Sequence, residues 1–422
     1  MIHFLSPLPP KQTGTADYLM QLLVDLEDDL GPDIRRHIKL WDQFEHMKDR
    51  DCLREQGWLA DDMAEARFTP EDFVFHFLAS NDFHRWVWAT LARRAAANVI
   101  SVVHDLTAFP MIRSMARDPS SGLTRQDELL ALRYEFGMQS DWMADHFDDL
   151  TPTARYFLMG QGITLARSKT VIVHSEYARM RLLTESVSGL PMPNFKVLAH
   201  PRPRFMPFIA MPPDAPGKDI FCVGSIGFYS SIKRNESLLE AFGAFAHTLN
   251  ADDRCRVRLV FVGKIEDHLR LEAERILNRW AIQDLVSFTG YVDEEALQAW
   301  QKRIDLQMNL RFPSCGETSG TLARALVLGK RVVCSRFAAF HEENATWTVS
   351  VDPIEEFPEL LHILTTEFSR WKGSDNSGTK PALQPTPKAQ FSEFIASLIA
   401  RKNEFKKLHQ NPLAKVEVSP GF

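Results

Sequence analysis

The sequence predicts an α/β protein with two parallel sheets, each covered by helices. Short apolar runs alternate along most of the chain with segments that repeat apolar residues at helical spacing, which is typical of parallel strands joined by helices. A proline-rich stretch at residues 200–216 separates two such series. With 422 residues, the chain is long enough for two domains, each with a core of its own.

The strands are predicted from short apolar runs that stop where a loop toward a helix should begin. They include Asn98–Val103, Thr170–Val173, Asp219–Val223, Val257–Val262, Val286–Thr289 and Arg331–Cys334. Helical spacing predicts helices at Glu236–Leu249, Asp267–Trp280 and Glu294–Arg303. After a polar stretch from Lys372 to Pro387, which is typical of a flexible loop, a final helix is expected from about Ala389 to Lys407.

The prolines set the predicted domain boundaries, because proline breaks both helix and sheet. Residues 1–200 are expected to form the N-terminal domain and residues 201–216 the linker. A C-terminal domain follows at 217–388, and a helix and tail at 389–422 end the chain.

The composition excludes several classes of protein. The sequence is 45% hydrophobic and 25% charged, as expected of a globular chain, and its net charge of −6 gives no sign of general nucleic-acid binding. Its five cysteines are scattered, without a Cys-x-x-Cys spacing, which argues against a disulfide framework and a zinc site. There is neither a basic leader with a cleavage site nor a run of about 20 apolar residues. We therefore expect a cytoplasmic protein.

The most informative segment runs from Asn309 to Cys334. Its small, polar centre, Gly316 to Thr321, precedes a predicted helix and includes the carboxylate of Glu317. Backbone amides at such a helix N-terminus bind phosphate oxygens, and glycine permits close approach. An ordinary helix cap, formed by Thr318 or Ser319, is the alternative interpretation.

This segment resembles the donor-binding motif of family 4 glycosyltransferases, in which R-x-P-x-x-G-E leads into a helix and then G-x-P-V-V. Other pieces of the chain resemble the same family in the same order, and the resemblance covers nearly all of the chain up to about residue 345. These pieces are Leu5–Tyr18, Asn81–His84, Val103–Leu106, Val173–Arg179, Cys222–Gly227, Ser231–Phe242, Val260–Gly263 and Val286–Val292.

The resemblance implies a GT-B fold, in which two Rossmann-like domains face each other across a cleft. The C-terminal domain would hold most of a nucleotide sugar, and the sugar would be transferred with retention at the anomeric carbon and without a metal ion. In agreement, the aspartate pairs of the sequence, such as Asp28-Asp29, lie in helical or turn contexts typical of solvated surface.

Departure of a nucleoside diphosphate requires cations and amide donors around the developing phosphate charge. Lys233 is the expected cation, although a solvent-facing loop lysine is the alternative. In many relatives an arginine follows the glycine of the first C-terminal strand, but Ser225 holds that register here, so Arg234 or Arg311 is expected to substitute. The remaining donor-binding residues are expected to be Gly224, Gly316, Thr318, Ser319, Gly320 and Thr321.

Two residues are expected to be catalytic by the same resemblance. His104 resembles the family histidine that points into the cleft, where it hydrogen-bonds a sugar hydroxyl or stabilises positive charge at the reacting carbon. Glu317 matches the first glutamate of an E-x7-E pattern and would approach the donor sugar hydroxyls and the loop backbone. The second glutamate, which usually holds the ribose hydroxyls, is absent, and Arg324 falls where it would lie.

The N-terminal half contributes further candidates. Gly14 with Thr15 would let the first loop approach the diphosphate, unless they form a simple tight turn. Asn81, His84 and His174 are expected either to contact the acceptor or to hold neighbouring loops by hydrogen bonds.

The resulting hypothesis is a metal-independent retaining glycosyltransferase, without a cofactor, that moves a sugar from a nucleoside-diphosphate sugar to an acceptor hydroxyl. The acceptor would be a glycan, a lipid-linked molecule or a protein in bacterial polysaccharide or glycoconjugate assembly. Weak peripheral contact with the inner face of the cytoplasmic membrane is a further expectation, from the basic end of the last helix. A catalytically inactive sugar-nucleotide-binding partner protein is the alternative. A dehydrogenase is disfavoured, because no Gly-x-Gly-x-x-Gly follows a predicted strand.

Overall fold

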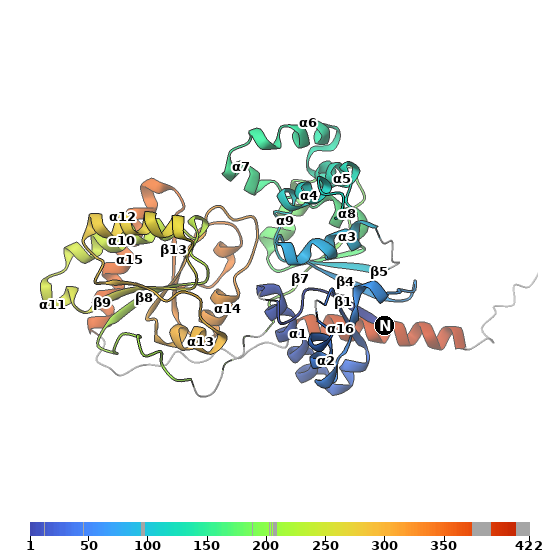
Figure 1. Ribbon diagram of the computed structural model, residues 1–422, viewed down its shortest axis with the longest axis horizontal. Coiled ribbons are helices and arrows are strands. Elements are labelled where there is room, and N and C mark those ends of the chain that lie inside the picture. The colour runs from blue at the N-terminus through green and yellow to red at the C-terminus, as the bar shows by residue number, and fades with distance from the viewer. Residues whose placement is uncertain are drawn as a thin grey trace, which may run out of the picture.

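The computed structural model describes residues 1–11, 13–44, 46–93, 98–187, 189–201, 203, 205, 209–373 and 390–410; Met47 and residues 403–410 are described by their backbone alone. Two wholly parallel sheets organise the chain (Figure 1). The first has the strand order β3-β2-β1-β4-β5-β6-β7. Its strands are β1 (Ile2–Leu5), β2 (Ile38–Asp42), β3 (Leu59–Asp62), β4 (Phe73–Leu78), β5 (Asn98–Val103), β6 (Thr170–Val173) and β7 (Asn194–Val197).

The second sheet has the strand order β10-β9-β8-β11-β12-β13. Its strands are β8 (Phe221–Ile226), β9 (Val257–Val262), β10 (Val286–Phe288), β11 (Leu306–Asn309), β12 (Arg331–Ser335) and β13 (Trp347–Val349). The sequence-predicted strand at Asp219–Val223 starts two residues later and continues to Ile226, so Gly224 and Ser225 lie inside β8.

Helices cover both faces of each sheet, which explains why the strands are apolar on both sides. Successive residues of β4 enter two different cores: Val74 packs with α3, α4 and α5, whereas Phe75 packs with α1 and α16. The helices of the N-terminal domain are α1 (Gly14–Leu30), α2 (Met47–Glu55), α3 (Arg85–Arg93), α4 (Phe109–Ala116), α5 (Arg125–Phe136), α6 (Ser140–Asp145), α7 (Pro152–Phe157), α8 (Gly162–Arg167) and α9 (Glu176–Thr184).

The C-terminal sheet is covered in the same way. Phe221 and Val223 of β8 pack against α10, α12 and α15, and the intervening Cys222 packs against α13 on the other face. These helices are α10 (Asn235–Thr248), α11 (Ala251–Arg254), α12 (Asp267–Trp280), α13 (Glu294–Arg303), α14 (Gly320–Val327) and α15 (Pro353–Gly373). The predicted loop from Lys372 to Pro387 lies mostly outside the described residues, as does part of the predicted linker.

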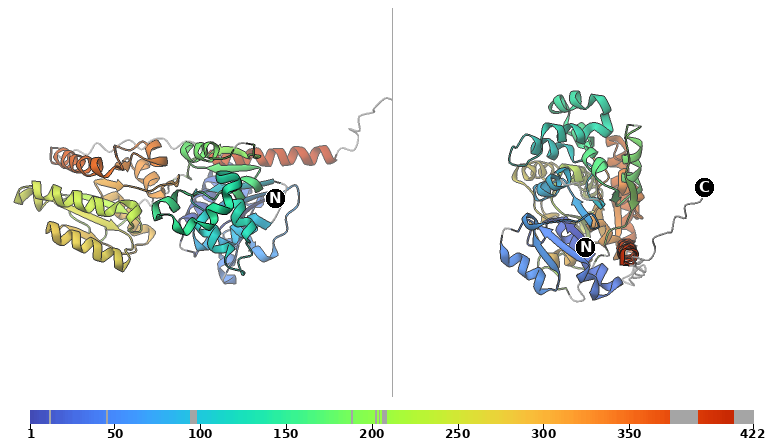
Figure 2. Two further views of the ribbon diagram at one scale, coloured as in Figure 1. Left: turned by 90° about the horizontal axis from the view of Figure 1, so that it is seen from above. Right: turned by 90° about the vertical axis from the view of Figure 1, so that its right-hand side faces the viewer.

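The last helix, α16 (Gln390–Gln410), returns to the N-terminal domain and packs beside α1 (Figure 2). Phe391, Ile395 and Leu398 are buried in the core beneath β4. Lys402 donates from Nζ to Asp72 Oδ1 at 3.1 Å. The apolar stripe of α16 is therefore used inside the molecule. No helix among the described residues is both long and apolar enough to cross a membrane.

Contact of this helix with lipid stays a prediction. Arg401 is exposed, and each basic residue near an anionic surface adds about 1 kcal/mol of attraction. We expect weak flotation of the protein with phosphatidylserine vesicles at low salt, lost at about 0.5 M salt because the attraction is screened. A protein that stays at the bottom of the gradient at low salt would contradict this expectation.

Candidate functional site

A cavity of about 430 Å³ lies where the carboxyl ends of the two sheets face each other. Its walls come from the loops after β1, β4 and β5 and from the loops after β8 and β11. In the first sheet, β1 and β4 are neighbours: the strands that follow β1 extend the sheet on one side, and the strands that follow β4 extend it on the other. In the second sheet, β8 and β11 are neighbours with the same arrangement. Ligands of open parallel sheets bind at such switch points. The fold thus places the cavity where both domains can hold one ligand.

Two helices, one from each domain, begin at this cavity. Gly14 is the first residue of α1, Gly320 is the first residue of α14, and both line the cavity. A Cβ atom at either position would meet no atom within 4 Å. The first amides of a helix have no partner within the helix and carry partial positive charge. Both helix ends therefore offer N–H donors to an anion beside open space.

The loop before α14 is fixed by its own hydroxyl groups. Ser319 is the N-cap: its Oγ accepts a hydrogen bond from the Leu322 amide at 3.3 Å, and it also contacts the hydroxyl of Thr321 at 3.0 Å. Thr318 is hydrogen-bonded to Nε2 of His200, which comes from the segment between the domains. Ser319 therefore takes the capping position, and Thr318, Ser319, Gly320 and Thr321 all line the cavity, as does Thr15 from α1.

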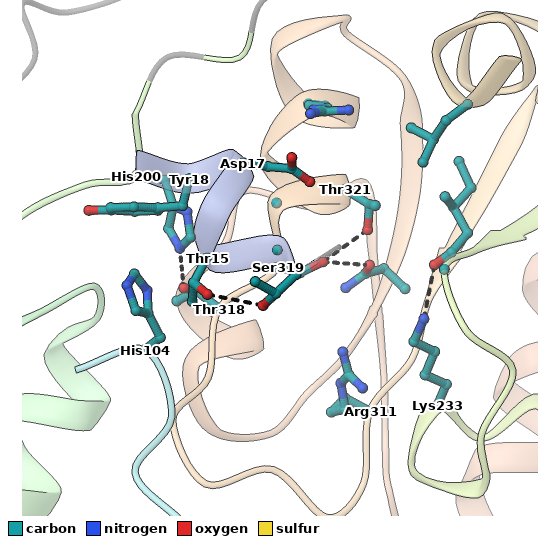
Figure 3. A pocket seen from close by; sticks show the side chains of 18 of the residues that line it. Thr15, Asp17, Tyr18, His104, His200, Lys233, Arg311, Thr318, Ser319 and Thr321 are labelled. Carbon is teal, nitrogen blue, oxygen red and sulfur yellow. Dashed lines mark hydrogen bonds between the residues drawn. The ribbon is translucent and has the colours of Figure 1, made fainter. Parts of the chain in front are cut away.

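Lys233 and Arg311 place positive charge at one end of the cavity (Figure 3), and Arg324 also lines it. Lys233 donates from Nζ to the carbonyl oxygen of Ile226 at 3.1 Å. Burial, with a smaller contribution from the nearby Arg311 guanidinium, lowers the pKa of Lys233 to about 7. Of the two arginines expected to substitute at the Ser225 register, the structure brings Arg311 to the cavity. Arg234 instead forms two hydrogen bonds with the buried carboxylate of Glu356.

A cluster of aromatic rings, packed edge-on or tilted against one another, lies at the opposite end of the cavity. His104 lies 4.5 Å from the ring of Tyr18 and 5.2 Å from that of His174, and His200 lies 4.6 Å from His174, measured between ring centroids. Burial lowers the pKa of His104 and His200 well below the ordinary value, and that of His174 to about 4. His104 is thus a neutral imidazole, and its Nε2 has no partner among the described residues.

Glu317 does not line this cavity. Its Oε2 accepts the Cys315 amide at 2.8 Å and its Oε1 accepts the hydroxyl of Tyr156 at 3.1 Å, a contact between the two domains. The carboxylate faces an adjoining cavity of about 340 Å³ instead. Asp105 lines both cavities, and burial raises its pKa. The structure thus places Glu317 at the adjoining cavity, and its contact with a donor sugar stays a prediction.

Other expected site residues take structural positions. Gly224 lies beneath the cavity, where a Cβ would clash with Ile304, and Gly316 packs against Leu106 of the other domain. Asn81 lines the cavity, and its Oδ1 lies 2.8 Å from Nδ1 of the buried His84 behind it. His174 makes a hydrogen bond of 2.8 Å from Nδ1 to the carbonyl of Leu198 and does not line the cavity.

Several lining residues were not singled out by the sequence analysis. Asp17 and Tyr18 follow Gly14 on α1, and they belong to the Ala-Asp-Tyr piece of the motif, which is the signal that could have found them. His200 is the last residue of the predicted N-terminal domain, next to the predicted linker, and Glu294 begins α13 without any motif around it. Arg324, noted only for replacing a glutamate, donates from Nη1 to Glu294 Oε1 at 2.6 Å.

Two further features bear on ligands. In the part of the chain that the structure describes, no group of three or more His, Cys, Asp or Glu side chains could hold a metal ion. A separate open cavity of about 640 Å³ lies in the N-terminal domain, lined by Asp62, Asp82, Arg85, Trp86 and Arg93 among others.

The open space at Gly320 leads to a prediction. Gly320→Leu should lower the affinity for nucleoside diphosphates about tenfold or more, because its side chain would fill the cavity that the phosphates need. The melting temperature should not fall, since the backbone there needs no glycine and the space is empty. Gly320→Ala adds one carbon and is the matched control, expected to bind within a few-fold of the wild type. Equal binding by the leucine variant in calorimetry would place the phosphates elsewhere.

Comparison with known proteins identifies the fold. No protein-family model matches the sequence, and no curated protein matches it. The chain is similar to HepE of Anabaena, whose structure was determined in complex with UDP-glucose, with a TM-score of 0.50 and 14% identity over 97% of this chain and 99% of that chain. It is also similar to WaaG, a glycosyltransferase involved in lipopolysaccharide biosynthesis, with a TM-score of 0.53 and 12% identity over 94% of this chain and 99% of that chain.

A third similar structure is the N-terminal domain of trehalose-6-phosphate phosphatase from Candida albicans, with a TM-score of 0.55 and 10% identity over 95% of this chain and 98% of that chain. At these identities the likeness establishes the fold alone. The chain has the GT-B fold, in which two Rossmann-like domains face each other across a cleft.

Proposed function

We propose that the protein is a retaining, metal-independent glycosyltransferase that moves a sugar from a nucleoside-diphosphate sugar to an acceptor hydroxyl. The observation that carries the proposal is the interdomain cavity, in which Lys233, Arg311 and the starts of α1 and α14 meet a neutral His104. Cations and amides suit a diphosphate leaving group, and an unpartnered imidazole nitrogen suits a sugar hydroxyl.

In this proposal the bond between the anomeric carbon and the phosphate oxygen breaks as negative charge collects on the diphosphate. Lys233, Arg311 and the helix amides stabilise that charge, which is where electrostatic catalysis has its largest effect. The acceptor oxygen bonds to the anomeric carbon on the face that the phosphate leaves, and its proton passes to a phosphate oxygen. The fold is shared with HepE, which was solved with UDP-glucose, and with the glycosyltransferase WaaG, which supports sugar transfer from a nucleotide sugar.

The test begins with binding and ends with turnover. A panel of UDP, GDP and ADP sugars is screened by thermal shift, because a ligand at about 100 times its Kd stabilises the folded state by about 2.7 kcal/mol. The stabilising donor is then incubated with cell-envelope glycans as acceptors, and release of nucleoside diphosphate is measured with transfer of labelled sugar. We expect one diphosphate released per sugar transferred, and NMR of the product should show the anomeric configuration of the donor.

The same experiment distinguishes a glycosyltransferase from the alternative function. A catalytically inactive sugar-nucleotide-binding protein would be stabilised by a donor without releasing diphosphate, with any acceptor tested. Absence of stabilisation by every nucleotide sugar would overturn both assignments. Bacterial polysaccharide or glycoconjugate assembly remains the proposed pathway, and transfer to envelope glycans is its direct test.

Metal independence is a separate prediction. Because Lys233 and Arg311 already place positive charge in the cavity, we expect the rate of diphosphate release to change less than about twofold in EDTA. Restoration of a lost activity by manganese after dialysis would show instead that a metal neutralises the diphosphate.

A further inference from the structure

Apart from Asp105, the charged side chains that line the cavity form two groups, one basic and one of net negative charge. Lys233 and Arg311 are close enough for Arg311 to lower the pKa of Lys233. Asp17 and Glu294, one from each domain, form the acidic group, and Arg324 is paired with Glu294. Figure 3 shows Asp17 well separated from Lys233 and Arg311. A ligand that spans the cavity therefore meets cations at one part and carboxylates at another.

Hydrogen bonds hold one oxygen of the Glu294 carboxylate, and the other oxygen has no donor among the described residues. Its Oε1 accepts hydrogen bonds from Arg324 Nη1 at 2.6 Å and from Gln298 Nε2 at 2.8 Å. Its Oε2 accepts no hydrogen bond from any described residue, and the side chain is 45% exposed where it lines the cavity. Arg324 is 11% exposed, so its guanidinium is fixed by packing. The pair thus presents a positioned acceptor to a ligand.

The neighbouring groups indicate what this acceptor receives. Asp17, Glu294 and Arg324 together carry a net negative charge, which disfavours a phosphate there, whereas hydroxyl groups donate well to a carboxylate. Leu297, one helical turn after Glu294, adds an apolar surface. These residues suit the hydroxyl-bearing sugar ring of a nucleoside, flanked by its base.

We propose that Glu294, aligned by Arg324, accepts hydrogen bonds from the ribose hydroxyls of the donor nucleotide and makes the protein select ribonucleotides over 2′-deoxyribonucleotides. The inference rests on the proposed function, because it assumes that the phosphates lie at Lys233 and Arg311. It also accounts for Arg324 at a position where a glutamate was expected: the arginine orients a carboxylate that comes from a different helix.

The test uses nucleoside diphosphates without the transferred sugar, so that only the ribose contact is varied. Calorimetry first measures the affinity of the wild-type protein for UDP, GDP and ADP. The affinity for the tightest-binding of these is then compared with the affinity for its 2′-deoxy form. We expect the wild type to prefer the ribose form about tenfold or more, as for a hydrogen bond to a charged group. Glu294→Ala should reduce this ratio to within about twofold, and Glu294→Gln serves if the alanine variant does not fold.

The matched control is Glu295→Ala, since Glu295 is the exposed neighbour of Glu294 on the same helix and does not line the cavity. It should keep the full preference. Arg324→Ala should lower the ratio and Arg324→Lys should restore part of it, which a merely structural residue would not do. A Glu294→Ala variant that binds diphosphates with an unchanged ratio overturns this inference and leaves the proposed function standing. A wild type that binds no nucleoside diphosphate overturns both.

Discussion

Lys233→Ala is expected to weaken nucleoside-diphosphate binding by roughly tenfold to a hundredfold. The ammonium is the cation nearest to the Ile226 and Gly227 end of the cavity, and a charge-assisted hydrogen bond to phosphate contributes about 1.5–3 kcal/mol. Titration calorimetry measures the change. Lys218→Ala, at an exposed lysine of the same domain, is the matched control and should bind like the wild type. Unchanged affinity of the Lys233 variant would assign the phosphates to Arg311 alone.

The pKa of Lys233 adds a pH dependence to this prediction. In the free protein the pKa is lowered to about 7, so most Lys233 side chains are neutral at pH 8. A bound diphosphate favours the ammonium form and raises the pKa again, so binding at pH 8 should take up as much as about one proton. Calorimetry in two buffers of different ionisation enthalpy should reveal this uptake in the wild type. It should be missing in Lys233→Ala.

The lowered pKa of Lys233 should also make the free energy of unfolding of the free protein depend on pH. The unfolded chain keeps its lysine protonated up to about pH 10.4, whereas the folded chain loses that proton near pH 7. Between these values the unfolded state binds more protons, so the free energy of unfolding gains a contribution that rises with pH. The difference in stability between wild type and Lys233→Ala should therefore shift in favour of the wild type from pH 7 to pH 10. A constant difference would mean that the pKa of Lys233 is normal.

His104→Ala is expected to reduce turnover about a hundredfold and to leave nucleoside-diphosphate affinity within about twofold. The imidazole lies at the end of the cavity away from Lys233 (Figure 3), so its loss should affect the reacting sugar and spare the phosphates. Positioned proton donors and acceptors contribute roughly 10²–10⁴-fold to rate. His104→Gln keeps a polar group there and should retain more turnover.

Stability must be followed in parallel, because His104 packs against Tyr18, Phe77 and His174. If both variants melt near the wild-type temperature and turn over at the wild-type rate, His104 is a packing residue only. Loss of diphosphate binding together with turnover would instead place the phosphates at the histidine end.

The fold class could be predicted because the strands and helices named from the sequence each carry a local pattern. The apolar run of Val257–Val262 and the helical spacing of Asp267–Trp280 coincide with β9 and α12. Where β8 ends could not be predicted, because Gly224 is a poor strand former, and its close contact with Ile304, which leaves no room for a Cβ, is not visible in the sequence. Tertiary packing decided that boundary.

The candidate site was predictable only within each domain. The loop from Thr318 to Thr321 and Lys233 could be found because each lies in a local motif next to a strand or helix. The pairing of Glu294 with Arg324 joins residues 30 positions apart, and the contact of His200 with Thr318 joins two domains. Neither contact leaves a pattern in one sequence. The hydrogen bond that Tyr156 donates to Glu317 could not be predicted for the same reason, since the two residues belong to different domains.

The central claim is that the interdomain cavity holds the diphosphate of a nucleotide sugar, and a crystal structure with the tightest-binding nucleoside diphosphate tests it most directly. The account predicts phosphate oxygens within hydrogen-bond distance of Lys233 Nζ and of the first amides of α14, with the ribose beside Glu294. Nucleotide density in the 640 Å³ cavity lined by Arg85, Trp86 and Arg93, with the interdomain cavity empty, would contradict it.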